Sequence, residues 1–366
     1  MVRQGEVLSC GIANFWFDLL DFLSMRFLIL AVTLLFPADT WWAVRESGVD
    51  SNLRGVSIVV DESLGGDATI WATGSNGAVV RSSDSGKSWK RLAIPEGDSL
   101  DIRGVQAFDS GIAYVMASGE GAKSRIYKTT DGGKSWKQQY AGENKAFFLD
   151  ALVCADEKRC FALSDPVDGK FLLIATEDGQ SWKKLPGDHM PAALAKEGAF
   201  AASNSALCLE GKDIFFGTGG PAARVFHSSD VGRTWAVEET PVASGNASSG
   251  IFSLVCDGKT IVAVGGDYQN PAQSGKNAAF SRDGGKTWEL AAIPPTGYRS
   301  GVATFRAGYV AVGPTGTEVS ADGSHWKHVD GTQLNAITFS GGGGKGWAAG
   351  PHGSVARFMD QTQYSL

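Results

Sequence analysis

The sequence predicts an all-β fold, and its composition is the first reason. The chain has 366 residues, among them 48 Gly and 11 Trp but only 5 Met. Glycine costs about 1 kcal/mol inside a helix, whereas aromatic residues favour strands. The hydrophobic fraction of 43% is enough for a large core and excludes wholesale disorder. Short strands joined by tight turns therefore fit this composition best.

The charge balance excludes some classes of partner. The formal net charge is −6, and the isoelectric point is about 5.5. Because the chain has no overall basic field, we expect no nucleic-acid partner and no binding to anionic membranes.

A repeated motif predicts the architecture. Its terminal tryptophans are spaced by 38 to 53 residues, a period typical of four-stranded propeller blades. Full copies are SSDSGKSW at 82–89, TTDGGKSW at 129–136, SSDVGRTW at 228–235 and SRDGGKTW at 281–288, and shortened copies are TEDGQSW at 176–182 and SADGSHW at 320–326.

The residues of this motif indicate a structural role. Asp and Ser or Thr side chains bond to backbone N–H groups of a tight turn, Gly permits a positive φ, and Trp starts the next strand. Because their carboxylates are occupied in this way, we expect no catalysis from the six motif aspartates, Asp84, Asp131, Asp178, Asp230, Asp283 and Asp322.

Counting blades gives seven. First strands are expected to begin near Arg54, Arg103, Asp150, Ala202, Gly250, Arg299 and Asn335. The seventh unit lacks its fourth strand, but Trp42 lies 47 residues before Trp89, which is one repeat length. We therefore expect residues 41–46 to pair with the strand at 353–358, closing the ring and removing an open sheet edge.

The motif resembles the Asp-box, or bacterial neuraminidase repeat, S-x-D-x-G-x-[ST]-W. Over about residues 42–358, the wider pattern is similar to the photosystem II stability/assembly factor family, in a bacterial branch often labelled "oxidoreductase". This resemblance implies a propeller with an arginine patch that recognises a partner's chain. No G-x-G-x-x-G opens a helix, so we expect no cofactor and no redox activity.

The amino terminus resembles an export signal. An apolar run at 27–36 follows Met25 and Arg26, and it is too short to span a bilayer. We expect residues 1–40 to be an upstream extension plus signal peptide starting at Met25, and 41–366 to be one propeller domain. The protein would be periplasmic or extracellular, with no stable membrane span after processing. A longer signal anchor is the alternative.

The cysteines fit an oxidising compartment. Cys154 and Cys160 flank a polar connection between two apolar runs and can form a disulfide across a hairpin. We interpret Cys208 and Cys256 as buried free thiols. No Cys/His cluster has metal-ligand spacing, so no metal site is expected.

Candidate binding residues gather, by topology, at the channel mouth remote from the Asp-box turns. From first-strand starts and second-to-third-strand loops we expect a funnel containing Arg54, Arg103, Asp150, Asp165, Glu197, Arg224, Asp267, Tyr268, Tyr298 and Arg299, with Asp168 and His352 nearby. The long loop 265–277 is expected to overhang it. Four converging arginines suit carboxylate, sulfate or phosphate groups.

These residues support a binding protein without chemistry of its own. A glycan, an anionic small molecule or a protein tail is the expected ligand, and the protein is expected to be a monomer. One alternative is a salt-bridge network around a water-filled channel. Another is a glycosidase or lyase that uses Asp165, Glu197 and Asp150, since glycoside hydrolysis needs two carboxyl groups about 5–10 Å apart.

Overall fold

The computed structural model describes residues 40–61, 66–306, 308–341 and 344–359. The expected signal region lies outside these residues, and the compact unit that holds the strands begins at Trp41. In the described residues, no helix reaches the length and hydropathy that crossing a bilayer requires.

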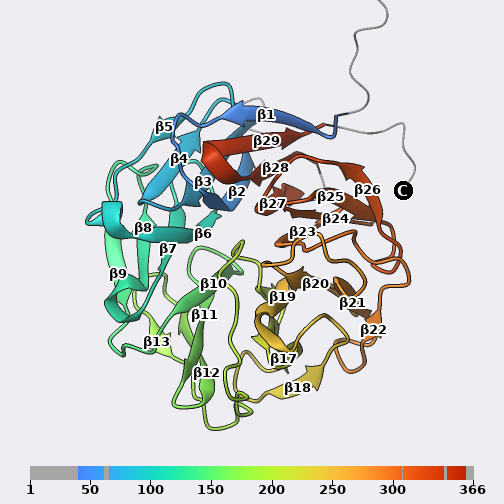
Figure 1. Ribbon diagram of the computed structural model, residues 1–366. Helices are drawn as coiled ribbons and strands as arrows, with labels where there is room; N and C mark the ends of the chain where they lie inside the picture. The colour runs from blue at the N-terminus through green and yellow to red at the C-terminus, as the bar shows by residue number, and fades with distance from the viewer. Residues whose placement is uncertain (1–39, 62–65, 307, 342–343, 360–366) are drawn as a thin grey trace, which may run out of the picture. The chain divides into compact units, whose positions relative to one another are not determined.

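Seven antiparallel sheets are arranged in a ring, which confirms the all-β seven-bladed propeller (Figure 1). The first three in chain order are β2 (Leu53–Asp61), β3 (Asp67–Gly74), β4 (Ala78–Ser82) and β5 (Lys90–Arg91); β6 (Asp101–Ala107), β7 (Ala113–Ser118), β8 (Arg125–Thr129) and β9 (Lys137–Ala141); and β10 (Leu149–Cys154), β11 (Cys160–Val167), β12 (Lys170–Thr176) and β13 (Lys183–Lys184).

The remaining four sheets complete the ring. They are β14 (Leu207–Glu210), β15 (Asp213–Gly217), β17 (Arg224–Ser228) and β18 (Ala236–Glu239); β16 (Gly219–Gly220), β19 (Asn246–Asp257), β20 (Thr260–Asp267), β21 (Ala278–Ser281) and β22 (Glu289–Leu290); β23 (Gly301–Phe305), β24 (Gly308–Gly313), β25 (Gly316–Ser320) and β26 (Lys327–Asp330); and β27 (Ala336–Phe339), β28 (Gly346–Ala349), β29 (Ser354–Phe358) and β1 (Trp42–Glu46). The helices of the described residues are single 3₁₀ turns at Gly97–Ser99, Gly121–Lys123 and Pro351–Gly353.

The amino-terminal strand closes the ring, as the repeat count predicted. β1 pairs antiparallel with β29, with Trp42 opposite Phe358 and Glu46 opposite Ser354. The Trp42 indole N–H also donates to Thr317 Oγ1 at 2.8 Å in the neighbouring sheet. Each first strand contacts the next, from β2 through β6, β10, β14, β19, β23 and β27 back to β2.

Asp-box tryptophans connect adjacent sheets. Trp89 packs edge-on against Trp347 of β28, Trp136 against Trp71 of β3, and Trp182 against Tyr114 of β7. At Gly86, whose φ is +79°, a Cβ would collide with the Trp347 ring. The motif glycine is therefore required both for its turn and for this contact.

One first strand begins later than expected. The strand placed near Ala202 starts at Leu207, and residues 199–206 before it lie outside any strand. Gly198 bridges to Gly219, and Phe200 stacks on Phe252 with ring centroids 3.8 Å apart. This segment lines part of a cavity at the sheet ends.

Both cysteine pairs form disulfides. Cys154 and Cys160 lie opposite each other in β10 and β11 and are bonded. Cys208 and Cys256 are also bonded, so the expectation of two free thiols was wrong. They are on β14 and β19, the first strands of neighbouring sheets, which the fold brings side by side.

Candidate functional site

A cavity of about 570 Å³ lies where first strands of several sheets meet, and we call it the central cavity. It combines guanidinium, carboxyl and aromatic groups. Its lining includes Arg54, Arg103, Asp150, Asp165, Phe200, Phe252, Tyr268 and Tyr298, together with Phe148, Ala199, Ala201, Ala202, Ser300, Pro314 and Asn335.

A recurring β-bulge supplies four of these side chains. In each of four first strands, the pairing register skips the lining residue: Arg54 in β2, Arg103 in β6, Asp150 in β10 and Phe252 in β19. A bulge re-aims the side chain of the extra residue. The same backbone irregularity therefore presents a different chemical group to the cavity from each sheet.

Arg54 is the exceptional charge of the cavity. Its half-buried guanidinium makes no hydrogen bond or ion pair with any described residue. Burial lowers the pKa of Arg54, and the nearby charge of Arg103 lowers it further, while Asp101 and Tyr298 oppose the shift. Since arginine remains protonated in proteins, this site holds a cation whose donors are free for a ligand.

Arg103 is held in place by its neighbours. Its Nε and Nη2 atoms both lie 2.7 Å from Asp101 Oδ2, and Nη1 donates to the Ala201 carbonyl at 2.9 Å. The pair is partly exposed, since 26% of the Arg103 side chain and 31% of the Asp101 side chain are accessible to solvent. Arg103 therefore adds positive potential beside Arg54 but has fewer free donors.

Two carboxyl groups also line the cavity. Asp150 is buried, and neither of its oxygens has a hydrogen-bond partner of good geometry in the described residues. Burial raises its pKa well above the usual value and Asp165 adds to the rise, whereas Arg103 and the Asp165 N–H oppose it. Burial also raises the pKa of Asp165 to about 6, although its Oδ1 accepts from the Ala199 N–H at 2.9 Å.

Aromatic rings form another part of the cavity wall. Phe252 stacks on Phe200 with an interplanar angle of 11° and meets Tyr298 edge-on at 4.7 Å. Tyr298 is only 6% exposed, yet its hydroxyl makes no hydrogen bond with the described residues. Burial raises its pKa, while Arg54 and Arg103 oppose the rise. The neutral hydroxyl is therefore a further donor close to both guanidinium groups.

Three of the expected funnel residues, Glu197, Arg224 and Arg299, lie elsewhere, in two buried ion pairs. Arg224 Nε donates to Glu197 Oε1 at 2.8 Å, and Arg224 Nη2 bonds to the other oxygen. Arg299 Nη2 donates to Glu318 Oε1 at 2.7 Å, with both side chains fully buried. The arginines expected to converge thus divide into two that line the central cavity and two that are paired with buried glutamates.

Glu197 is fixed by further bonds. Its Oε1 accepts from Thr218 Oγ1 at 2.6 Å, and its Oε2 accepts from the Leu194 N–H at 2.7 Å. Because Arg224 also occupies both oxygens, Glu197 ties a loop to a strand. It does not line the central cavity.

Three remaining candidates also lie outside the cavity lining. Asp267 accepts from the Gln269 N–H and the Asn270 amide, which fixes the start of loop 265–277. Of that loop, Tyr268 lines the cavity. Asp168 occupies the turn after β11 with φ +54°, and exposed His352 lies 3.2 Å from Asp50.

At the opposite ends of the sheets, the Asp-box aspartates make dense hydrogen bonds. Asp84 accepts from Ser82 Oγ at 2.7 Å, the Ser88 N–H at 2.9 Å and Ser88 Oγ at 2.5 Å. These bonds hold the pKa of Asp84 well below its usual value, and the same pattern lowers the pKa of Asp131, Asp230 and Asp283 to about 2. Asp178 and Asp322 are bonded similarly.

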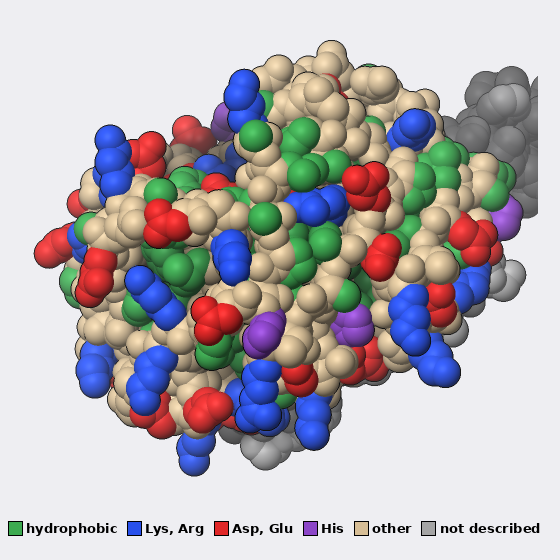
Figure 2. Space-filling view, turned by 90° about the horizontal axis from the view of Figure 1, so that it is seen from below, with side chains coloured by type: hydrophobic (Ala, Val, Ile, Leu, Met, Phe, Trp, Pro, Cys, Tyr) green, Lys and Arg blue, Asp and Glu red, His purple; other side chains and the backbone are tan. Residues whose placement is uncertain are grey.

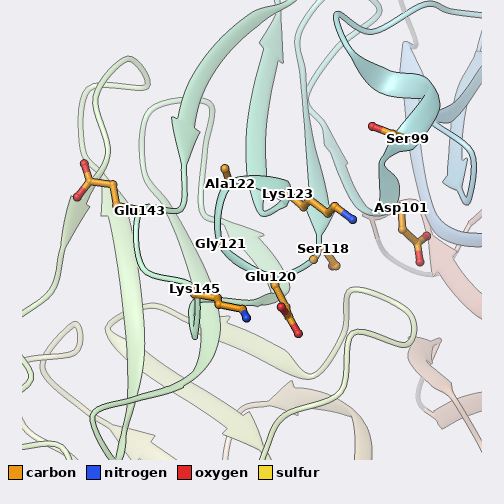
Figure 3. Close-up of a pocket in the computed structure, with 10 residues that line it drawn as sticks. Ser99, Asp101, Ser118, Glu120, Gly121, Ala122, Lys123, Glu143 and Lys145 are labelled. Carbon is orange, nitrogen blue, oxygen red and sulfur yellow. The ribbon is translucent and has the colours of Figure 1, made fainter.

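A second cavity, of about 770 Å³, is linked to the central cavity by the ion pair between Asp101 and Arg103. Figure 3 shows the residues that line this second cavity. Asp101, which holds Arg103, lines it together with Ser118, Glu120, Lys123, Glu143 and Lys145. Acidic and basic side chains are mixed here, as they are over the face drawn in Figure 2. Among the described residues, no three His, Cys, Asp or Glu side chains group as metal ligands.

Sequence reasoning placed Tyr268 and Tyr298 at the cavity but missed its phenylalanines, Phe200 and Phe252. Phe200 lies just before the strand that was expected to begin near Ala202, and Phe252 is an ordinary strand residue by composition. A signal was available in the Arg-Gly-Val triplets at 54–56 and 103–105, which mark the bulge position. The equivalent positions in the third and fifth repeats are Asp150 and Phe252.

Comparison with known proteins supports the Asp-box assignment. Residues 279–290 match the BNR/Asp-box repeat. No curated protein matches the chain. A structure of YCF48 bound to D1 peptide superposes with a TM-score of 0.62 at 14% identity, covering 88% of this chain and 98% of the other. YCF48 from Cyanidioschyzon merolae gives 0.59 at 17% identity, covering 87% and 99%.

The same architecture occurs in more distant proteins. The WD40 domain of Neurospora crassa Pan2 superposes with a TM-score of 0.57 at 14% identity, covering 87% of this chain and 95% of that one. Proteins with different repeats thus share the propeller ring, whereas the Asp-box motif distinguishes one kind of propeller from the others. The chain is therefore an Asp-box β-propeller with the fold of the YCF48 structures, in agreement with its resemblance to the photosystem II stability/assembly factor family.

Proposed function

We propose that this protein is a binding scaffold that captures a carboxylate-bearing segment of a partner protein in the central cavity, without chemistry of its own. The observation that carries the proposal is the half-buried Arg54 guanidinium, which has no partner among the described residues and borders a cavity of about 570 Å³. A guanidinium binds a carboxylate through two parallel N–H bonds.

Two further observations support a peptide as the ligand. The Tyr298 hydroxyl supplies a donor near Arg54. One structure with this fold is of YCF48 bound to D1 peptide. A glycan or a small anion, the other ligands expected from the sequence, would use the same guanidinium.

The test is capture of a random hexapeptide library with free carboxyl termini, compared with the same library amidated, by the purified protein. We expect enrichment of free acids and a loss of about 10-fold or more in affinity for Arg54→Ala, as for a charged hydrogen bond. Arg233→Ala, which changes an exposed arginine in an Asp-box turn, is the matched control. Equal binding of acids and amides would contradict the proposal.

A glycosidase or lyase is the second candidate, and the pair Asp150 and Asp165 favours it. Both line the central cavity, and burial raises both pKa values, as a general acid requires. Glu197, the third candidate, is occupied by Arg224. Cleavage of any member of a broad glycan panel, abolished by Asp165→Asn, would establish this function.

We also propose that the protein is exported to the periplasm or the outside of the cell. The apolar run at 27–36 and the two disulfides support this, because disulfides persist in oxidising compartments. Cell fractionation, followed by amino-terminal sequencing of the mature protein, tests it. A cytosolic protein with reduced cysteines would contradict it.

A further inference from the structure

We propose that the central cavity selects the last side chain of its ligand, and that the preferred ligand is a peptide ending in an aromatic or large aliphatic residue with a free carboxylate. This inference rests on the proposed function. It comes from the aromatic shelf, the group formed by Phe200, Phe252, Tyr268 and Tyr298, which lines the cavity together with Arg54.

The shelf is a continuous aromatic surface. Phe252 is its centre: it stacks on Phe200 at 3.8 Å and meets Tyr298 at 4.7 Å and Tyr268 at 6.1 Å, both edge-on. Phe252 and Tyr298 are buried and form a small apolar cluster with Ala202, distinct from the clusters between neighbouring sheets. Packing fixes these rings before any ligand arrives.

Tyr268 leaves apolar surface open at this cluster. It is 49% exposed, whereas Phe252, its ring neighbour, is only 2% exposed. The bonded carboxylate of Asp267 fixes the backbone just before it. A ligand side chain placed against Tyr268 and Phe200 would bury this surface, which stabilises binding by about 25 cal/mol per Å² of apolar area.

The charged and aromatic parts of the lining are adjacent. Arg54 and Arg103 both influence the Tyr298 hydroxyl, which belongs to the shelf. A carboxylate bound by Arg54 and Tyr298 therefore has its nearest substituent beside aromatic rings. The carboxyl-terminal residue of a peptide has this arrangement, since one carbon joins its carboxylate to its side chain.

The other polar groups of the lining favour a peptide over an acidic sugar. The Asn335 amide already donates to Asn52 Oδ1 and to the Leu53 carbonyl, and Ser300 Oγ donates to the Asn335 carbonyl. The remaining neutral lining near the shelf is Ala199, Ala201, Ala202 and Pro314. A sugar ring needs several hydrogen-bond partners for its hydroxyls. These neutral residues beside the shelf offer few, and the carboxyl groups of Asp150 and Asp165 are the acceptors that the lining would have to supply.

The experiment measures binding of three acetylated tetrapeptides, each Gly-Gly-Gly followed by Phe, Gly or Lys, as free acids and as amides, with glucuronic acid as a fourth probe. We expect the Phe acid to bind at least 10-fold more tightly than the Gly acid. Tyr268→Ala and Phe200→Leu should reduce that ratio below 3-fold and keep the preference for acid over amide. Ile293→Ala, which changes an exposed apolar residue outside the cavity lining, should leave the ratio unchanged.

Each other outcome has a defined meaning. Equal binding of the Phe, Gly and Lys acids, all weakened by Arg54→Ala, would show that the shelf does not select the last side chain. The proposed carboxylate site at Arg54 would still be supported. Binding of glucuronic acid but of no peptide would overturn both the shelf and the peptide ligand. Binding of none of the probes by the folded protein would overturn the proposed function together with this inference.

Discussion

Charged side chains have opposite surroundings at the two ends of the sheets. At the Asp-box end, each motif aspartate accepts bonds from its own turn, and its pKa is lowered. At the central cavity, neither Asp150 oxygen has a hydrogen-bond partner of good geometry among the described residues, Arg54 has no partner among them, and the pKa of Asp165 is raised. The first end has groups that stabilise the fold, and the second keeps groups that a ligand can satisfy.

The largest expected effect on stability comes from removing an arginine that is paired, in contrast to Arg54. Arg299→Ala would leave Glu318 buried without its guanidinium partner, and breaking such a pair costs about 3–5 kcal/mol. Denaturant unfolding should detect this loss of stability. Arg299→Ala should keep its affinity for the free-acid peptides. A variant that is as stable as the unchanged protein but no longer binds them would show that Arg299 is a ligand-binding residue.

The pH dependence of stability should have opposite signs at the two ends. Because the folded-state pKa of Asp165 is about 6 against an ordinary 3.8, the folded state binds the proton more tightly. The free energy of unfolding should therefore fall by up to about 3 kcal/mol as the pH rises from 4 to above 6. Asp165→Asn should remove that fall, and an unchanged slope in this variant would contradict the assignment.

The Asp-box aspartates should give the opposite trend. Their folded-state pKa values of about 2 at Asp131, Asp230 and Asp283 lie below the ordinary value. Stability from these groups is present above pH 4 and is lost as the pH falls toward 2. Unfolding measured between pH 2 and pH 4 checks the sign, and a stability that rises on acidification in this range would be inconsistent with it.

A smaller effect is expected from one Asp-box turn. Asp84→Ala removes the acceptor for Ser82 and Ser88, so we expect Tm to fall by roughly 2–4 °C. Binding of the Phe-terminated acid should be unchanged, because the turn lies at the far end of the sheet. Thermal melts and peptide titrations of the same preparation provide both readouts.

The smallest effect on stability is expected at the cavity. Arg54→Ala removes a guanidinium that has no partner among the described residues, so Tm should change by less than that of Asp84→Ala. Calorimetry of the two variants side by side tests the contrast. A larger loss for Arg54→Ala would mean that Arg54 has a structural role.

The repeat made most of the fold predictable from sequence, since its period sets the blade count and Trp42 lies one period before Trp89. The binding site was harder to predict from the sequence. Arg54, Arg103 and Asp150 were expected at the mouth and line the cavity, but Arg224 and Arg299 share the same residue type and form buried pairs. Such pairing depends on Glu197 and Glu318, whose proximity only the folded chain determines.

The central claim is that Arg54 meets the ligand's carboxylate at the cavity end of the propeller. A crystal structure of the protein with acetyl-Gly-Gly-Gly-Phe as the free acid tests this most directly. We expect the terminal carboxylate within hydrogen-bond distance of the Arg54 guanidinium and the Phe ring against Tyr268 and Phe200. A peptide bound at the Asp-box turns, with Arg54 uncontacted, would contradict the account.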